Sequence, residues 1–228
     1  MFYPMHRIDK VRMQKIAVDL LKLAKTRYKY SDLGNMLNLP ITVICRYING
    51  RVLPNFERAV EISKKLSEKI SLTNFINREI SAEGEVNIIR ILSNPVILSL
   101  IGIDATLRMA GKHVTKILSI NDISLVPATS ISLHMEKPLV IAQQYSIKYA
   151  TGGNTTINTY LPKHAIRAKD SVLIVEAVLD NIESTLSLIK NIGKSNANIT
   201  GIYAIIVHEK AMEKLKNVID KIEYVTMR

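Results

Sequence analysis

The chain has 228 residues, of which 47% are hydrophobic and 22% are charged. This composition is typical of a globular protein, and it excludes wholesale disorder and collagen-like or linker-like chains. The length suits two domains of ordinary size, one small and one medium.

No segment predicts export or a membrane span. The longest apolar run, Pro95 to Ile103, is too short to cross a bilayer. No charged segment followed by an apolar one opens the chain, so we expect no signal peptide and a cytoplasmic location. The single Cys45 cannot form an internal disulfide, and it lacks the neighbouring Cys and His residues of a metal site. We therefore expect no metal, no cofactor and no membrane partner.

The net charge of +11 is concentrated near the N-terminus. Residues 1–80 contain 15 of the 31 Lys and Arg residues but only 7 of the 20 Asp and Glu residues. A basic surface attracts polyanions through long-range electrostatics and counterion release. The alternative is a solvated basic face that has no partner.

The first 70 residues predict a compact all-α domain of four or five short helices. Asn38 and Leu39 form a tight turn, and Pro40 takes a first-turn position, where its missing N–H is tolerated. Gly50 ends the helix that follows. Apolar spacing predicts helices over 15–26, 30–37, 41–49 and from Phe56 to Leu66.

Residues 67–87 are more polar, and we expect them to connect two domains. Beyond them, short runs rich in β-branched residues alternate with helical stretches. This alternation predicts βαβ units and a mostly parallel sheet. The strands are expected over 123–126, 139–142, 172–175, 199–207 and 222–226.

Residues 33–62 predict two helices that are crossed by a tight turn and share one core, which leaves the outer face of the second helix free. A recognition helix presents hydrogen-bonding side chains to base edges, with basic residues nearby for phosphates. Thr42 and Arg46 suit the first role, and Lys29 and Arg51 suit the second. The predicted DNA-binding residues are Lys29, Tyr30, Ile41, Thr42, Cys45, Arg46, Asn49 and Arg51.

This segment resembles the helix-turn-helix of the Cro and repressor-like family. The family usually carries polar residues where this chain has Pro40 and Ile41, so no base preference is carried over. The alternative is an ordinary helical bundle with a basic face. The matching features are Leu33, Leu37-Asn38-Leu39, Ile44, Arg46-Tyr47, Asn49-Gly50-Arg51 and Pro54.

The run VLIVEAVLDNIEST, residues 172–185, predicts a buried strand that leads through a loop into a helix. It resembles the phosphoribosyl-diphosphate signature of type I phosphoribosyltransferases. In that family an acidic pair grips the ribose hydroxyls, and a loop rich in Thr and Gly wraps the 5′-phosphate. Here Glu176 keeps the first acid and Ala177 replaces the second. Alternatively, Glu176 is a strand-end carboxylate that caps the next helix.

The loop of this signature predicts poor phosphate binding. Asp180 and Glu183 would place two carboxylates beside a phosphate, and Ile182 and Glu183 replace glycines whose backbone amides close around it. Hydroxyl groups in this region could still bind a less charged ligand. The predicted ligand-binding residues are Thr129, Ser130, Glu176, Asp180, Asn181, Ser184 and Thr185.

Two further segments resemble the same family. Residues 124–144 resemble its strand, diphosphate loop, helix and following strand, with Ala128 to Ile131 in the loop. Gln143 and Gln144 stand where many relatives carry a basic pair. Residues 151–166 resemble the β-hairpin of bacterial purine repressors and archaeal helix-turn-helix–phosphoribosyltransferase regulators. The resemblance covers roughly residues 86–228.

These patterns predict a multidomain α plus α/β protein. Residues 1–80 would form an all-α helix-turn-helix domain, and residues 86–228 a mostly parallel α/β domain with a type I phosphoribosyltransferase-like fold. We expect a homodimeric transcription regulator that binds double-stranded DNA, with a catalytically inactive second domain. Its effector, if one exists, would be a nucleotide-like or nucleobase-like small molecule.

Two alternatives remain. One is an active phosphoribosyltransferase with an accessory DNA-binding domain. The other is an architectural or RNA-binding protein that binds nucleic acid without sequence preference.

Overall fold

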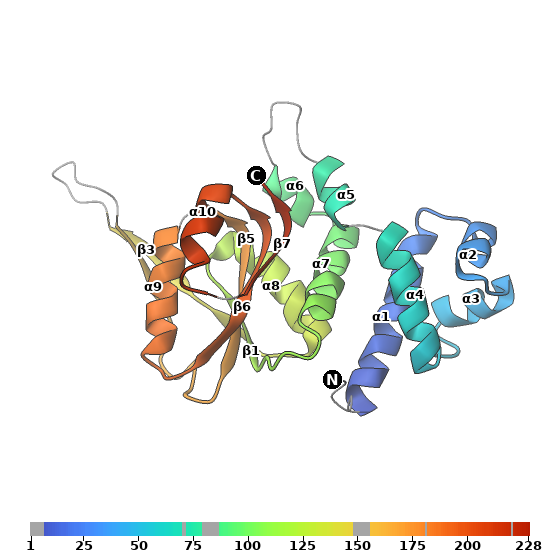
Figure 1. Cartoon of the computed structure of the whole chain (residues 1–228), viewed down its shortest axis with the longest axis horizontal. Helices are drawn as coiled ribbons and strands as arrows, with labels where there is room; N and C mark the ends of the chain where they lie inside the picture. The colour runs from blue at the N-terminus through green and yellow to red at the C-terminus, as the bar shows by residue number, and fades with distance from the viewer. Residues whose placement is uncertain (1–6, 70–71, 79–86, 148–155, 181, 220) are drawn as a thin grey trace. The chain divides into compact units, whose positions relative to one another are not determined.

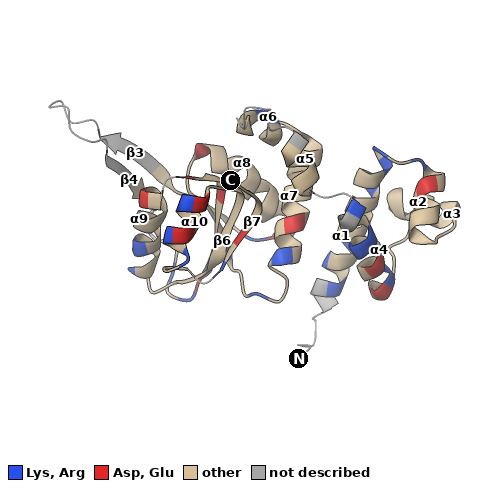
Figure 2. Ribbon diagram, turned by 45° about the horizontal axis from the view of Figure 1, so that its top comes forward, with Lys and Arg blue, Asp and Glu red and all other residues tan. Residues whose placement is uncertain are grey.

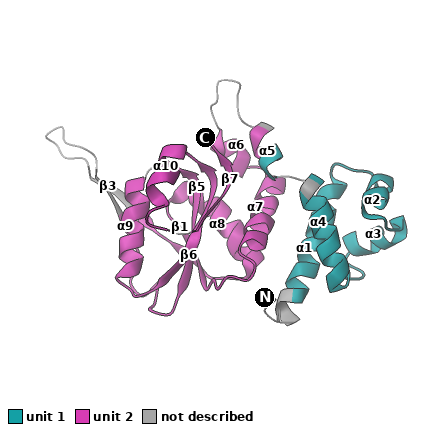
Figure 3. Cartoon of the chain, in the orientation of Figure 1, with its two compact units in different colours: residues 1–74 teal, residues 75–228 magenta. Residues whose placement is uncertain are grey.

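The computed structural model divides the chain into two compact units, residues 1–74 and 75–228 (Figure 3). Each unit is described by itself. No helix in the described parts of the chain is both long enough and apolar enough to cross a bilayer. The structure describes residues 7–69, 72–78, 87–147, 156–180, 182–219 and 221–228.

In the described part of unit 1 the regular elements are helices (Figure 1). The first and fourth helices lie side by side, and the first also contacts the third. Apolar side chains from all four meet in one core, which includes the fully buried Leu21, Leu33, Ile44 and Leu66. The helices are α1 (Arg7–Lys25), α2 (Tyr30–Leu37), α3 (Ile41–Ile48) and α4 (Phe56–Lys69).

The turn between α2 and α3 is as short as the sequence predicts. Asn38 adopts the left-handed conformation with φ 53°, and its backbone N–H donates to the carbonyl of Gly34. The N–H of Leu39 donates to the same carbonyl at 3.1 Å. Pro40 is the N-cap of α3, one residue before the predicted first-turn position.

The predicted connection between the domains is partly helical. Helix α4 continues to Lys69, and α5 (Leu72–Arg78) follows, so residues 67–87 are not a simple polar linker. Residues 70–71 and 79–86 lie outside the described residues.

Unit 2 contains a five-stranded sheet in which every pair of neighbouring strands is parallel. The order across the sheet is β2-β1-β5-β6-β7. β5 is buried along almost its whole length, because its run of Val, Ile and Leu lies between two layers of helices. The strands are β1 (Lys116–Ser119), β2 (Leu139–Ile141), β5 (Ser171–Leu179), β6 (Asn198–Val207) and β7 (Ile222–Met227).

Helices cover both faces of this sheet (Figure 1). Two helices, α7 and α8, pack against each other on one face, and α8 also contacts β1 and β5. Two others, α9 and α10, cover the opposite face. The helices of unit 2 beyond α5 are α6 (Ile88–Leu92), α7 (Pro95–Arg108), α8 (Asp122–Met135), α9 (Ile182–Gly193) and α10 (Glu209–Leu215).

A separate antiparallel pair consists of β3 (Gln143–Ile147) and β4 (Thr156–Tyr160). The side-chain amide of Asn191 on α9 donates to the carbonyl of Thr159 at 3.1 Å. A hairpin was predicted over residues 151–166, but the pair begins earlier, at Gln143. Residues 151–155 of that prediction lie outside the described residues.

The strand predicted over residues 123–126 is wrong, because these residues belong to α8. Asn121 caps this helix by accepting a hydrogen bond from the backbone N–H of Ser124, and Asp122 adds a favourable negative charge to the first turn. These local signals outweigh the β propensity of a four-residue apolar run. The strand of this region is β1, which ends at Ser119, before the predicted segment begins.

Candidate functional site

The order of the strands locates a candidate site in unit 2. The chain leaves β1 into α8 on one face of the sheet and leaves β5, the neighbour of β1, into α9 on the other. Such a reversal opens a crevice beyond the carboxyl ends of the two strands, and open α/β sheets bind their ligands there. The candidate site therefore lies between the turn after β1 and the turn after β5.

One hydrogen bond stabilises the turn after β1, and another joins the start of α8 to β5. The hydroxyl of Ser119 donates to the carbonyl of Asn121 at 2.8 Å. The hydroxyl oxygen of Ser124, which is fully buried, accepts a hydrogen bond from the backbone N–H of Ala177 at 2.9 Å. Neither Asn121 nor Ser124 was predicted from the sequence, although Asn121 directly precedes an acidic residue, a pattern that is typical of a helix start.

The turn after β5 contains only two residues. β5 ends at Leu179 and α9 begins at Ile182, which leaves Asp180 and Asn181 between them. Asn181, a predicted ligand-binding residue, lies outside the described residues.

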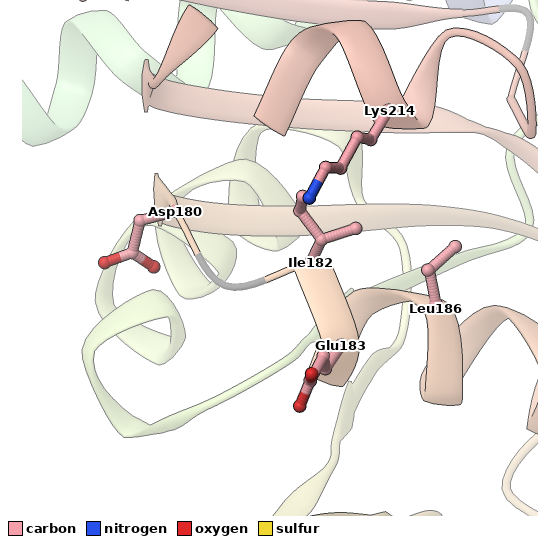
Figure 4. A pocket seen from close by; sticks show the side chains of 5 residues that line it. All are labelled: Asp180, Ile182, Glu183, Leu186 and Lys214. Carbon is pink, nitrogen blue, oxygen red and sulfur yellow. The ribbon is translucent and has the colours of Figure 1, made fainter. Parts of the chain in front are cut away.

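An open hollow of about 460 Å³ adjoins this turn (Figure 4). The exposed side chain of Lys214 extends from α10 toward Ile182, while Asp180 and Glu183 are exposed beside it. The hollow thus combines two carboxylates, one ammonium group and apolar surface. It is lined by Asp180, Ile182, Glu183, Leu186 and Lys214.

Glu176 differs from these exposed carboxylates because it is only 3% exposed. The hydroxyl of Thr185 donates to its Oε1 at 2.8 Å. Burial raises the pKa of Glu176 to about 8; the hydrogen bond from Thr185 acts in the opposite direction, and the nearby Asp180 raises the pKa further. Glu176 is therefore mostly protonated at neutral pH.

Two predicted ligand-binding residues do not lie in a loop. Thr129 and Ser130 are inside α8, so the diphosphate loop predicted over 128–131 is wrong. The hydroxyl of Thr129 donates to the carbonyl of Leu125 at 2.7 Å, and that of Ser130 donates to the carbonyl of Leu98 on α7 at 2.6 Å. Ser184, which was expected in the loop, lies with Thr185 in the first turn of α9, and both are buried.

The predicted DNA-binding residues of unit 1 lie mostly on its surface. Lys29 precedes α2, and its backbone N–H donates to Asp32 at 3.1 Å. Tyr30 and Cys45 are half-buried, and the ammonium group of Lys25 lies 4.7 Å from the centre of the Tyr30 ring. Figure 2 shows the charged residues of these helices. The exposed members of the predicted set are Lys29, Ile41, Thr42, Arg46, Asn49 and Arg51.

An ionic network joins α7 to the sheet within unit 2. The hydroxyl of the buried Tyr203 donates to Asp104 at 2.7 Å. Arg108 pairs with Asp104 at 2.7 Å and with Glu223 at 3.2 Å. Asp104 and Arg108 are partly exposed, yet each charge has a partner, so the network stabilises the packing of α7 without offering a reactive group.

No protein-family model matches this sequence. The xanthine phosphoribosyltransferase of Lacticaseibacillus casei is 21% identical over 166 residues, which covers 68% of this chain and 79% of that protein. The enzyme of the same name from Clostridium acetobutylicum is 24% identical over 180 residues, or 74% of this chain and 87% of that protein.

Solved structures support the same fold. The crystal structure of adenine phosphoribosyltransferase from Thermoanaerobacter pseudethanolicus matches with a TM-score of 0.57 and 11% identity, covering 68% of this chain and 99% of that chain. The sheet order and the helices on both faces define unit 2 as a doubly wound α/β protein. More narrowly, it has a type I phosphoribosyltransferase-like fold.

These comparisons contradict the functional prediction made from the sequence. A DNA-binding regulator with an inactive second domain was expected, but the matching relatives are named as phosphoribosyltransferases, which are enzymes. They give no support to double-stranded DNA as a partner, to a role in transcription or to the absence of catalysis. The substitutions at Ala177 and in the turn after β5 were given too much weight.

Proposed function

We propose that this chain is a phosphoribosyltransferase that transfers a 5-phosphoribosyl group from phosphoribosyl diphosphate to a purine base. The observation that carries the proposal is the match to xanthine phosphoribosyltransferases over more than two thirds of the chain. In this reaction a ring nitrogen of the base loses its proton and forms a bond to C1 of the ribose, and the bond from C1 to diphosphate breaks, so that diphosphate leaves with the bonding electron pair.

The geometry of unit 2 supports this proposal. The crevice at the carboxyl ends of β1 and β5 is the place where this class of sheet binds ligands. The hollow shares Asp180 with the turn after β5, and its other lining residues belong to α9 and α10, so it adjoins the crevice on the side away from β1. Its volume of about 460 Å³ is within the usual range of small-molecule pockets, about 300–1,000 Å³. The hydrogen bond from Ala177 to Ser124 holds the two sides of the crevice together, which preorganises the site.

A Mg²⁺ ion would arrive as part of the diphosphate substrate, and Asp180 or Glu183, whose side chains point in different directions in Figure 4, could each supply one carboxylate ligand to it. Mg²⁺ prefers oxygen ligands and is often held by one or two carboxylates together with substrate phosphates. Asp180 and Glu183 offer two exposed carboxylates at the hollow. The ion would supply positive charge to the departing diphosphate.

The same two carboxylates would repel the phosphate groups of the substrate unless a metal ion offsets their charge. A carboxylate about 4 Å from a phosphate charge costs about 4 kcal/mol at an effective dielectric of about 20. Lys214 offsets part of this repulsion, because its ammonium group lies on the other side of the hollow. We therefore expect phosphoribosyl diphosphate to bind tightly only in the presence of Mg²⁺.

A turnover assay tests the proposal. The full chain is incubated with phosphoribosyl diphosphate, Mg²⁺ and either xanthine, guanine, hypoxanthine or adenine, and nucleotide formation is measured by chromatography. We expect steady turnover with at least one base and none after chelation of Mg²⁺. No turnover with any base, together with no binding of phosphoribosyl diphosphate by calorimetry, would overturn the proposal.

A matched variant excludes a contaminating enzyme. Asp180→Asn removes one carboxylate from the hollow and leaves the exposed side chain almost unchanged in shape. The variant, purified in the same way, should lose most of the activity. Equal activity in both preparations would assign the turnover to a contaminant or remove Asp180 from the site.

A finer description of unit 1 is also a proposal: α2 and α3 form a helix-turn-helix arrangement. The short turn with a left-handed Asn38, and the burial of Leu33, Leu37 and Ile44 between the helices, support it. A solution structure of the chain tests the crossing of α2 and α3. We assign no binding partner to this arrangement.

A further inference from the structure

The side chain of Glu176 lies on the face of β5 that α9 covers. Side chains alternate between the two faces of a strand, so Val172, Ile174 and Glu176 share one face of β5. Val172 and Ile174 belong to the apolar core that also contains Leu188 and Ile192 of α9. Glu176 thus ends a buried apolar row instead of opening toward the crevice.

The contact with Thr185 ties this carboxyl group to α9. Thr185 is completely buried and lies in the first turn of the helix, and its hydroxyl donates to Glu176 at 2.8 Å. Ser184, the neighbour of Thr185 on the same turn, is also buried. The bond therefore fixes the start of α9 relative to the end of β5, next to the hollow.

The surroundings of Glu176 disfavour a charged carboxylate. Among the described residues, no Lys or Arg forms an ion pair with it. The charged residues near this end of β5 are the acids Asp122 on α8, Asp180 after β5 and Glu183 on α9, together with the exposed Lys214 on α10. Lys214 is not among the groups that shift the pKa of Glu176. β6 is uncharged and is followed by His208. A buried carboxylate without a cationic partner pays a large desolvation cost, so the neutral acid is favoured.

We propose that Glu176 is a positioning residue: an uncharged, buried acid that holds the first turn of α9 through Thr185 and does not contact the ribose of the substrate. This inference rests on the proposed phosphoribosyl transfer and deepens it. The exposed carboxylate that meets the substrate or its metal is then Asp180, four residues further along the chain.

Three variants separate the two roles. Glu176→Gln keeps the shape of the neutral acid and can still accept the hydrogen bond from Thr185, whereas Glu176→Leu cannot. Asp180→Asn removes the charge that is exposed at the hollow. We expect Glu176→Gln to keep the KM for phosphoribosyl diphosphate within about twofold, and Asp180→Asn to raise it about tenfold or more, since a hydrogen bond to a charged group is lost.

The pH dependence of unfolding gives a readout that needs no substrate. A neutral acid in the folded chain that ionises on unfolding makes the protein less stable as pH rises. The denaturant midpoint of the wild type should therefore fall between pH 5 and pH 8 more steeply than that of Glu176→Gln. Glu176→Leu should also lose this slope, but its kcat should fall because α9 is no longer held in place.

Opposite results would overturn the inference. If Glu176 grips the ribose as an anion, Glu176→Gln will raise KM as strongly as Asp180→Asn and will leave the pH profile of unfolding unchanged. If the wild type shows neither turnover with any base nor binding of phosphoribosyl diphosphate, the proposed function fails, yet the pH profiles still decide the charge of Glu176. The effects of Glu176→Gln and Thr185→Val on unfolding should be non-additive, and simple additivity would count against the contact.

Discussion

Helix α3 and the end of β5 both contain residues that were predicted to be functional, but those on α3 are mostly exposed and the one at the end of β5 is buried. Thr42 and Arg46 lie on the exposed face of α3, while Ile44 between them is fully buried. Glu176 at the end of β5 was expected either to bind a ligand or to cap the next helix, and it is buried and accepts a hydrogen bond from Thr185 in the first turn of α9. An amphipathic helix on the surface has one exposed face, so the spacing of its apolar residues predicts which side chains are exposed. A central strand is covered on both faces, so the exposure of a residue near its end depends on where the next helix begins.

The largest expected effect is a loss of stability on substitution of the buried face of α3, compared with its exposed face. Ile44→Ala should lower the free energy of unfolding by about 2–5 kcal/mol, because it leaves a cavity in the core of unit 1. Arg46→Ala should change it by no more than about 0.5 kcal/mol, because the side chain is exposed. Urea denaturation measures both. Similar losses in the two variants would mean that α3 is rotated from the orientation described here.

The second effect tests the burial of Glu176 in the wild type. The pKa is raised in the folded chain to about 8 from an ordinary value of 4.5, so the folded state binds more protons within this window. The stabilisation that the buried neutral carboxyl group contributes is complete below pH 4.5 and is lost as pH rises toward about 8. The free energy of unfolding falls over this range by at most about 1.4 kcal/mol per pH unit. Denaturation at several pH values, with Glu176→Gln as the reference, measures it. An identical slope in the two proteins would contradict the burial.

The third effect concerns the link between the two turns of the crevice. Ser124→Ala removes the acceptor for the backbone N–H of Ala177 and leaves this buried donor unsatisfied, at a cost of about 1–3 kcal/mol. Thr129→Ala is the matched control, because its exposed hydroxyl bonds only within α8. The control should cost less than Ser124→Ala in thermal unfolding. A larger cost for Thr129→Ala would show that the Ser124 bond does not hold the crevice together.

The smallest effect concerns the start of α8. Asn121→Ala removes the side-chain oxygen that caps the helix and should cost about 1 kcal/mol. Asn121→Asp keeps an acceptor and should restore most of the loss. Thermal unfolding of the two variants checks this expectation. If Asn121→Ala is as stable as the wild type, the cap is not the reason why residues 123–126 are helical.

The sequence predicted several elements of unit 2 closely. The run of Val and Ile residues that forms β5 was recognised, as were β2, β6 and β7, because each is a long or well-bounded apolar segment. β1 was missed because Lys116–Ser119 contains only two apolar residues and its neighbours supply most of its burial. The order of the strands and the crevice between β1 and β5 could not be read from any local pattern.

For the candidate site, the sequence by itself identified residues whose side chains could bind a ligand. The resemblance to the phosphoribosyl-diphosphate signature drew attention to Asp180 as a predicted ligand-binding residue and to Asp180 and Glu183 as carboxylates that oppose phosphate binding, and both lie at the hollow. Lys214 was not singled out, since it lies about 30 residues further along the chain and reaches the hollow only through the packing of α10. Ser124 was assigned to a strand, and its bond to β5 appears only once α8 is in place.

What the sequence determined about this protein is the helical character of residues up to about 66, the parallel α/β character of the remainder and the resemblance to type I phosphoribosyltransferases. These follow from the spacing of apolar residues and from short motifs, which are local properties. Only the tertiary structure decided that Glu176 is buried against Thr185 and that Asp180 is exposed. The physical reason is that burial, and with it the charge of a carboxyl group, depends on neighbours contributed by distant parts of the chain.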